Sequence, residues 1–92
     1  FFDAEPVNHC TDEEMVGFKE RIRQLGVKKT DVSESIMRVR KQYPRHYETW
    51  SDEECRILQE LMQKTNDLNL FCSCFQRTPG SIRIKVEGMN QN

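Results

Sequence analysis

The chain has 92 residues, enough for one domain or two very small ones, and a chain of this size buries only about 60 to 65% of the surface that its unfolded form exposes. A large catalytic cleft is therefore not expected. Charged residues make up 32% of the chain, yet the formal net charge is −1, so these totals indicate neither a uniformly polyanion-binding surface nor a solubilising acidic tail.

The sequence has no apolar run of about eighteen residues and no signal-peptide pattern, so we expect a soluble chain without a membrane span. Its start at Phe1 instead of Met indicates a piece of a longer protein. Of the four cysteines, Cys55 and Cys74 fall within predicted helices, and none of Cys10, Cys55, Cys72 and Cys74 has a partner at the C-x₂-C spacing of zinc sites. We expect reduced cysteines and no metal site.

No feature of the sequence favours catalysis. His9 and Cys10 are adjacent, but a Cys–His nucleophile pair needs an oriented base within reach. The acidic pairs at 13–14 and 53–54 are explained by helix capping, and no glycine-rich phosphate loop is present. We therefore predict that the chain is not an enzyme and takes no cofactor or small-molecule substrate.

The chain opens with residues 1–8, which lack periodicity and are predicted to form a flexible arm; packing of the first two phenylalanines onto the domain is the alternative. Thr11-Asp12-Glu13-Glu14 then forms a capping box. The apolar positions that follow lie on one helical face and stop before Gly26, which suits a C-cap: Met15, Phe18, Ile22 and Leu25. This pattern predicts the first helix.

A second helix is predicted from a new cap at Thr30-Asp31. Its apolar stripe, which stops before Pro44, consists of Val32, Ile36, Val39 and Tyr43. A short polar linker, 44–48, follows.

Three short helices are predicted beyond this linker. Ser51 and Glu54 make a second capping box, and Thr78 with Pro79 marks another helix start. Two apolar stripes lie between these starts: Leu58, Leu61 and Met62, then Leu68, Phe71 and Phe75. The last helix is expected to end at Gly88, which leaves 89–92 as a tail.

The segment Ile82-Arg83-Ile84-Lys85-Val86 alternates apolar and charged residues, which is typical of a strand, and Pro79-Gly80 before it is typical of a turn. A helix is favoured because one isolated strand would have no partner in this chain.

Two segments carry a family resemblance: Thr49-Trp50-Ser51-Asp52-Glu53-Glu54 and Phe75-Gln76-Arg77-Thr78-Pro79-Gly80-Ser81-Ile82-Arg83. They resemble the first and third helices of a Myb/SANT-like, homeodomain-like three-helix unit. The resemblance implies an all-α fold with such a unit over 49–88 and Trp50 in its core. Residues 9–43 resemble a reduced unit of the same kind, as in tandem Myb proteins, although His9-Cys10 stand where the tryptophan would be and the middle helix would be very short or missing.

The resemblance implies sequence-specific binding of double-stranded DNA in a nuclear protein of chromatin, transcription or telomeres, with the helix from Pro79 to Val86 in the major groove. Between residues 28 and 45 six residues are basic and two are acidic, which suits contacts to phosphates. The candidate DNA-binding residues are Lys28, Lys29, Ser35, Arg38, Arg40, Lys41, Gln76, Arg77, Ser81, Arg83 and Lys85.

The alternative is a SANT-type module that binds nuclear protein partners or a second copy of itself without binding DNA. The near-neutral charge favours this alternative, because DNA-binding modules are usually basic. Met37 on the polar side of the second predicted helix would suit a partner surface or a thymine methyl group.

Overall fold

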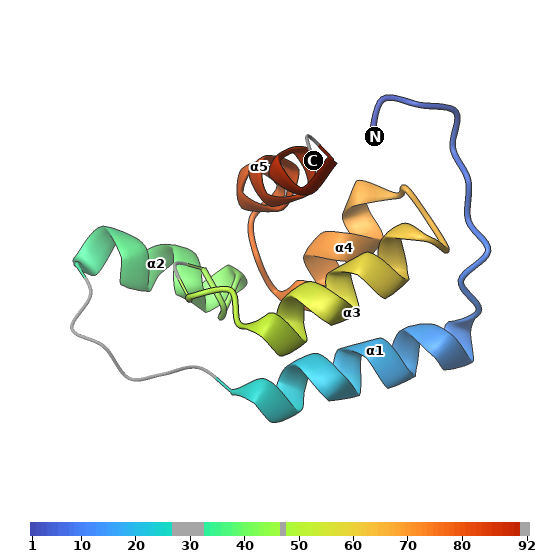
Figure 1. Cartoon of the computed structure of the whole chain (residues 1–92). Helices are drawn as coiled ribbons and strands as arrows, with labels where there is room; N and C mark the ends of the chain where they lie inside the picture. The colour runs from blue at the N-terminus through green and yellow to red at the C-terminus, as the bar shows by residue number, and fades with distance from the viewer. Residues whose placement is uncertain (27–32, 47, 91–92) are drawn as a thin grey trace.

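The computed structural model describes residues 1–26, 33–46 and 48–90, and these residues contain five α-helices and no strand (Figure 1). The helices are α1 (Asp12–Leu25), α2 (Glu34–Gln42), α3 (Asp52–Met62), α4 (Leu68–Phe75) and α5 (Pro79–Asn90). The all-α expectation is confirmed, and the strand alternative for residues 82–86 is wrong because they lie inside α5.

The helix starts follow the predicted caps. The Thr11 hydroxyl accepts a hydrogen bond from the Glu14 N–H, and the Glu14 carboxylate accepts one from the Thr11 N–H, so α1 has the complete capping box. Gly26 ends α1 with φ 68°, a conformation that favours glycine. The Thr78 hydroxyl accepts from the Ser81 N–H at 3.3 Å, which caps α5.

Two helix boundaries differ from prediction. The cap of α2 is Ser33, whose hydroxyl accepts from the Ile36 N–H; the predicted cap at residues 30–31 lies outside the described residues. Helix α5 continues through Gly88 to Asn90, so the predicted end at Gly88 is wrong. Glycine lowers helix propensity but keeps its N–H donor, and a single one does not have to end a helix.

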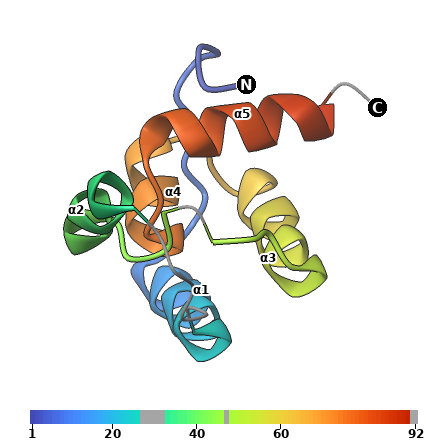
Figure 2. The same ribbon diagram turned by 90° about the vertical axis from the view of Figure 1, so that its left-hand side faces the viewer.

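One hydrophobic core joins four of the helices (Figures 1 and 2). Helix α1 packs on α3 and α4, and α4 packs on α5. The buried core residues are Met15, Phe18 and Ile22 from α1, Ile57, Leu58 and Leu61 from α3, Phe71, Cys74 and Phe75 from α4, and Ile82 and Val86 from α5. Helix α1 therefore shares the core of 49–88, whereas α2 buries no residue completely.

Residues 1–10, called the arm below, are packed on the domain. Phe1 and Phe2 make edge-on contacts with the ring of Phe71, with centroid distances of 6.0 and 5.3 Å. Asn8 and Thr65 form an isolated antiparallel bridge between the arm and the α3–α4 loop. These contacts correspond to the alternative in which the two phenylalanines pack onto the domain.

None of the helices in the described ranges is long and apolar enough to cross a bilayer. The four thiols are free, and Cys74 lies in the core, where desolvation raises its pKa to about 12.

Candidate nucleic-acid interface

Helices α4 and α5 are joined by a tight turn of three residues, 76–78. Gln76 adopts the left-handed conformation (φ 57°, ψ 40°), and its N–H donates to the Cys72 carbonyl at 2.9 Å. The Gln76 carbonyl accepts from the Arg45 N–H at 3.0 Å, which fixes the turn against the linker. Two helices joined by so short a turn occur both in αα-hairpins and in helix-turn-helix motifs.

A buried ion cluster holds this turn. The Glu54 carboxylate is completely buried and accepts two hydrogen bonds from the Arg77 guanidinium, from Nε at 2.8 Å and from Nη2 at 2.9 Å. Arg45 Nη2 donates to the same carboxylate at 2.7 Å. Paired hydrogen bonds from one guanidinium to one carboxylate are strong and directional. The Glu54 carboxylate therefore fixes two arginines from distant parts of the chain.

The remaining guanidinium donors connect further segments. Arg77 Nη1 donates to the Glu48 carbonyl at 2.7 Å, and Arg45 Nη1 donates to the Gly26 carbonyl at the end of α1. The Arg77 guanidinium also lies over the Trp50 ring, 4.0 Å from its centroid. Glu54, Arg45 and Arg77, called the buried cluster below, thereby hold the end of α1, the linker, α3 and the turn together.

The buried cluster changes two expectations. Arg77 is only 1% exposed, so it does not lie on a surface that DNA can reach, and its predicted contact with DNA is not available in this structure. Ser51 caps α3 as predicted, since its hydroxyl accepts from the Glu54 N–H, but the Glu54 carboxylate does not return to the cap. The two arginines bind that carboxylate instead, because a buried charge requires opposite charges.

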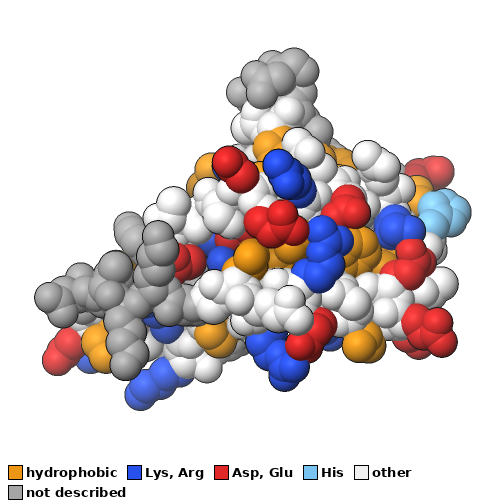
Figure 3. Space-filling model, turned by 60° about the horizontal axis from the view of Figure 1, so that its bottom comes forward, with side chains coloured by type: hydrophobic (Ala, Val, Ile, Leu, Met, Phe, Trp, Pro, Cys, Tyr) orange, Lys and Arg blue, Asp and Glu red, His pale blue; other side chains and the backbone are white. Residues whose placement is uncertain are grey.

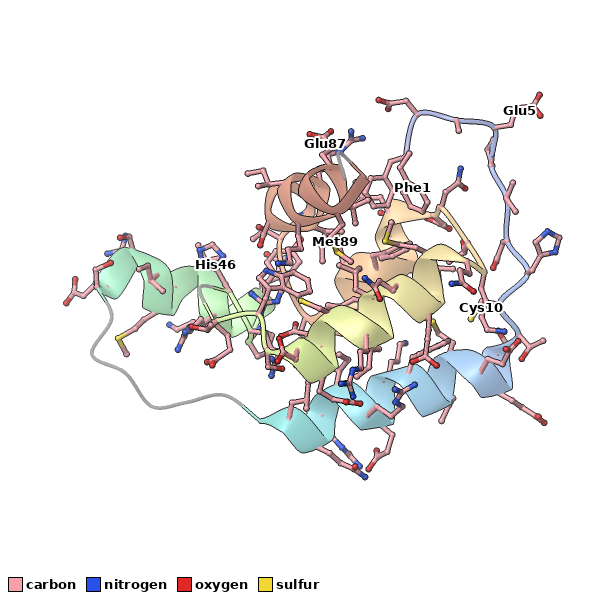
Figure 4. All side chains as sticks on the ribbon, in the orientation of Figure 1. Phe1, Glu5, Cys10, His46, Glu87 and Met89 are labelled. Carbon is pink, nitrogen blue, oxygen red and sulfur yellow. The ribbon has the colours of Figure 1, made fainter. Side chains whose placement is uncertain are left out.

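The outer face of α5 is opposite the buried Ile82 and Val86. It consists of Gly80, Ile84, Glu87 and Gly88, and Ile84 is 74% exposed. Figure 4 shows Glu87 on the side of α5 that points away from the other helices. The outer face is therefore narrow and flat, with one apolar and one acidic side chain.

Two cations lie at the edges of this face. Arg83 lies toward the arm, with its guanidinium 5.7 Å from the Phe2 centroid and 3.7 Å from the Asp3 carboxylate. Lys85 lies toward the other side, with Nζ 5.7 Å from the Trp50 centroid. The helix thus has a positive charge on each side of its exposed face.

A groove of about 460 Å³ lies between α5 and the segment that precedes α3. Its lining residues are His46, Glu48, Trp50, Arg77, Thr78, Ser81, Ile84 and Lys85. Arg40 Nε donates to the His46 carbonyl at 2.7 Å, which attaches the end of α2 to the side of this groove. Figure 4 shows His46 between α2 and α5.

The predicted DNA-binding residues are therefore only partly brought together. Ser81 and Lys85 line the groove, Arg40 is bonded at its side, and Arg83 lies on the opposite edge of α5. Ser35, Arg38 and Lys41 are exposed on α2. Gln76 lines a separate hollow beside α1, with Val16 and Arg23. Lys28 and Lys29 lie outside the described residues.

The opposite side of the molecule has charges of both signs. Figure 3 shows acidic and basic side chains mixed over the face that α1 and α3 form. Arg21 bridges the two helices through Glu60 at 2.7 Å and Glu53 at 3.4 Å, and Arg23 pairs with Glu20. Pairs of this kind cancel the local field, so this face is a poor candidate for binding a polyanion.

Arg45 and Glu54 are the residues that sequence reasoning missed. Their signal is weak, because an arginine in a polar linker and a glutamate three residues after a cap both have ordinary local explanations.

In the part of the chain that the structure describes, no three His, Cys, Asp or Glu side chains are grouped to hold a metal ion. No family model, curated protein or solved structure matches the chain.

Proposed function

We propose that this chain is a sequence-specific double-stranded DNA-binding module of a nuclear protein, with a Myb/SANT-like unit over 49–88 and α5 as the helix that enters the major groove. The observation that carries the proposal is the three-residue turn between α4 and α5, which the buried cluster holds in place. A rigid turn fixes the direction in which α5 leaves the domain, and recognition of base edges requires a fixed direction.

The shape of α5 supports this role. The major groove is about 12 Å wide and admits one α-helix. Near the start of α5, Gly80 has no side chain and Ser81 has a small one, and a Cβ added at Gly80 would meet no atom within 4 Å, so this end can approach the bases closely. Ile84 would contact a thymine methyl group, and the Ser81 hydroxyl would reach a base edge or a phosphate.

The positive charges at the two edges of α5 suit contacts with the two phosphate strands. Because Arg83 and Lys85 flank the outer face, a helix placed in the groove would direct one cation toward each phosphate strand. Arg38 and Lys41 on α2 would add contacts to the backbone beyond the groove. Telomeric, chromatin and transcription proteins are the classes that the family resemblance suggests.

The test is a fluorescence-anisotropy titration against random and telomere-repeat duplexes at about 50 and 200 mM salt. Four phosphate contacts give a salt slope of roughly −3.6, so the affinity should fall by about two orders of magnitude between these concentrations. Changing Arg38, Lys41, Arg83 and Lys85 to glutamate should abolish binding.

A control with half of this charge change reverses Arg23 and Arg56, whose side chains are 75% and 74% exposed on α1 and α3. These two substitutions change the net charge in the same direction but leave α5 and α2 intact, so DNA binding should persist with a modest loss. Absence of binding by the unmodified chain at the lower salt concentration would contradict the proposal.

A SANT-type protein-interaction module is the second candidate, and the exposed Ile84 beside the groove favours it. Under this alternative the four charge reversals would leave partner binding largely intact, whereas Ile84→Glu would remove it. An apolar side chain at the centre of a protein interface contributes more to affinity than the charges at its rim.

A further inference from the structure

The arm is held at both ends, by hydrogen bonds to the α3–α4 loop near residue 8 and by the packing of Phe1 and Phe2 on Phe71. Near residue 8 it pairs with the α3–α4 loop: the His9 N–H donates to the Lys64 carbonyl at 2.6 Å, and the Asn66 N–H donates to the Val7 carbonyl at 3.1 Å. The Asn66 side chain adds three more bonds, accepting from the Val7 N–H at 2.8 Å and donating to the Glu5 carbonyl at 2.9 Å and to the Phe1 carbonyl at 3.4 Å. This part of the arm is fixed by backbone hydrogen bonding.

The first residues of the arm lie beside the middle of α5, as the two ribbon views agree (Figures 1 and 2). Phe2 packs between Phe71 of α4 and the Arg83 guanidinium. The next residue, Asp3, places its carboxylate 3.7 Å from Arg83 Nη2 while its own side chain is 89% exposed. One of the two cations at the edges of α5 is therefore paired with an acidic side chain of the same chain.

We propose that the arm is an autoinhibitory element that competes with DNA for Arg83, with the Asp3 carboxylate in the place that a backbone phosphate would take. The inference rests on the proposed function and adds a regulatory contact to it. The Asp3 carboxylate, 3.7 Å from Arg83 Nη2, partly neutralises this guanidinium, and a phosphate that pairs with the same guanidinium has to compete with it.

The exposure of the pair makes the exchange possible. An ion pair between exposed side chains contributes little to stability. A backbone phosphate carries the same single negative charge as the carboxylate, and the dense row of phosphates in a duplex lets DNA displace it. The fixed bonds near residue 8 keep the start of the arm close to α5 after displacement, so the competitor stays at high effective concentration. The arm thus lowers DNA affinity without preventing binding.

Asp3→Asn tests the competition, and Glu5→Gln is its matched control. Each substitution removes one negative charge from the arm, but the Glu5 side chain points away from α5 (Figure 4). At about 50 mM salt we expect Asp3→Asn to tighten DNA binding roughly two- to fivefold more than Glu5→Gln does, the range expected for loss of an exposed ion pair.

The same two substitutions, made in a chain that also carries Arg83→Gln, show whether Asp3 lowers the DNA affinity through Arg83. If Asp3 acts through Arg83, the difference between Asp3→Asn and Glu5→Gln disappears there. Equal effects of the two substitutions in the unmodified background, with DNA binding present, would overturn the autoinhibitory role and leave the proposed function standing. A chain that binds no duplex in any variant would overturn both.

Discussion

Glu54 is the residue on which the candidate site depends most. Its buried carboxylate is the shared acceptor for Arg45 and Arg77, so the cluster has two positive charges and one negative charge inside the protein. Removing one member of a buried ion pair costs more than the pair contributes, because the remaining charge is left without compensation.

We therefore predict that Glu54→Gln destabilises the fold by about 3 to 5 kcal/mol, as measured by urea unfolding. Glu53→Gln on the exposed side of the same helix is the control, and its effect should stay within about 0.5 kcal/mol. Comparable small losses for both substitutions would contradict the role assigned to the buried cluster.

The buried thiol of Cys74 should make the free energy of unfolding depend on pH. Desolvation raises its pKa from the ordinary value of 9.0 to about 12, so the folded chain keeps this proton at pH values where the unfolded chain loses it. The free energy of unfolding should therefore fall as the pH rises above about 9, by up to about 1.4 kcal/mol per pH unit.

The measurement is a series of urea unfolding curves between about pH 8 and 10.5 for the unmodified chain and for Cys74→Ala. Other groups titrate in both proteins, so the difference between the two curves isolates the thiol. Cys74→Ala should lose stability at pH 8 but show the shallower decline with pH. Parallel declines would show that Cys74 does not contribute.

Helix α5 is the element that the proposed function requires to be regular, and two glycines lie on its outer face. At Gly88 a Cβ would meet no atom within 4 Å, and the backbone is helical. Gly88→Ala should raise stability by roughly 0.5 to 1 kcal/mol, since alanine has the higher helix propensity.

Thermal unfolding measures this change, and Gly26→Ala provides the contrast. Gly26 also has open space around it, but its φ of 68° strains any side chain. The first substitution should raise Tm by a few degrees and the second should lower it. A decrease in Tm for Gly88→Ala would indicate that this position of α5 needs glycine for a reason other than helix formation.

Glu87 on α5 should weaken DNA binding. Its carboxylate is exposed on the outer face of α5, where it would approach the negative charges of DNA. Glu87→Gln should tighten binding several-fold at low salt in the anisotropy titration, with the gain reduced at high salt. Glu13→Gln on α1 removes the same charge at a distance from α5 and should change the affinity much less.

At the scale of the whole molecule, one core extends over the boundary between the two predicted units 9–43 and 49–88. Three buried side chains of α1 pack with those of α3, α4 and α5, and Arg45 connects the end of α1 to α3. A core this small cannot lose a helix without exposing much of its apolar surface to water.

We predict that residues 49–92 by themselves do not form a stable fold, whereas the full chain unfolds in one cooperative transition. Far-UV circular dichroism and Trp50 fluorescence should give coincident unfolding curves for the full chain. A cooperative unfolding transition in the shorter fragment would show that α1 is dispensable and that 49–88 is an independent unit.

The sequence by itself determined the helices, because their signals are local. Caps at Thr11, Ser51 and Thr78 and apolar stripes at three-to-four spacing act over one or two turns, and these starts agree with the structure. At residues 82–86 the local alternation was typical of a strand, and the lack of a partner strand in the chain favoured the helix that the structure has.

The tertiary structure alone decided which charges are buried and which remain exposed. Glu54 lies 9 residues from Arg45 and 23 from Arg77, and Phe1 of the arm is bonded to Asn66, which is 65 residues away in the chain. No periodicity connects such positions, because their contacts form only when the helices pack. Burying a charge away from water costs free energy unless an opposite charge lies beside it. Arg77 is buried because Glu54 pairs with it, whereas Arg83 and Lys85 lie at the edges of α5.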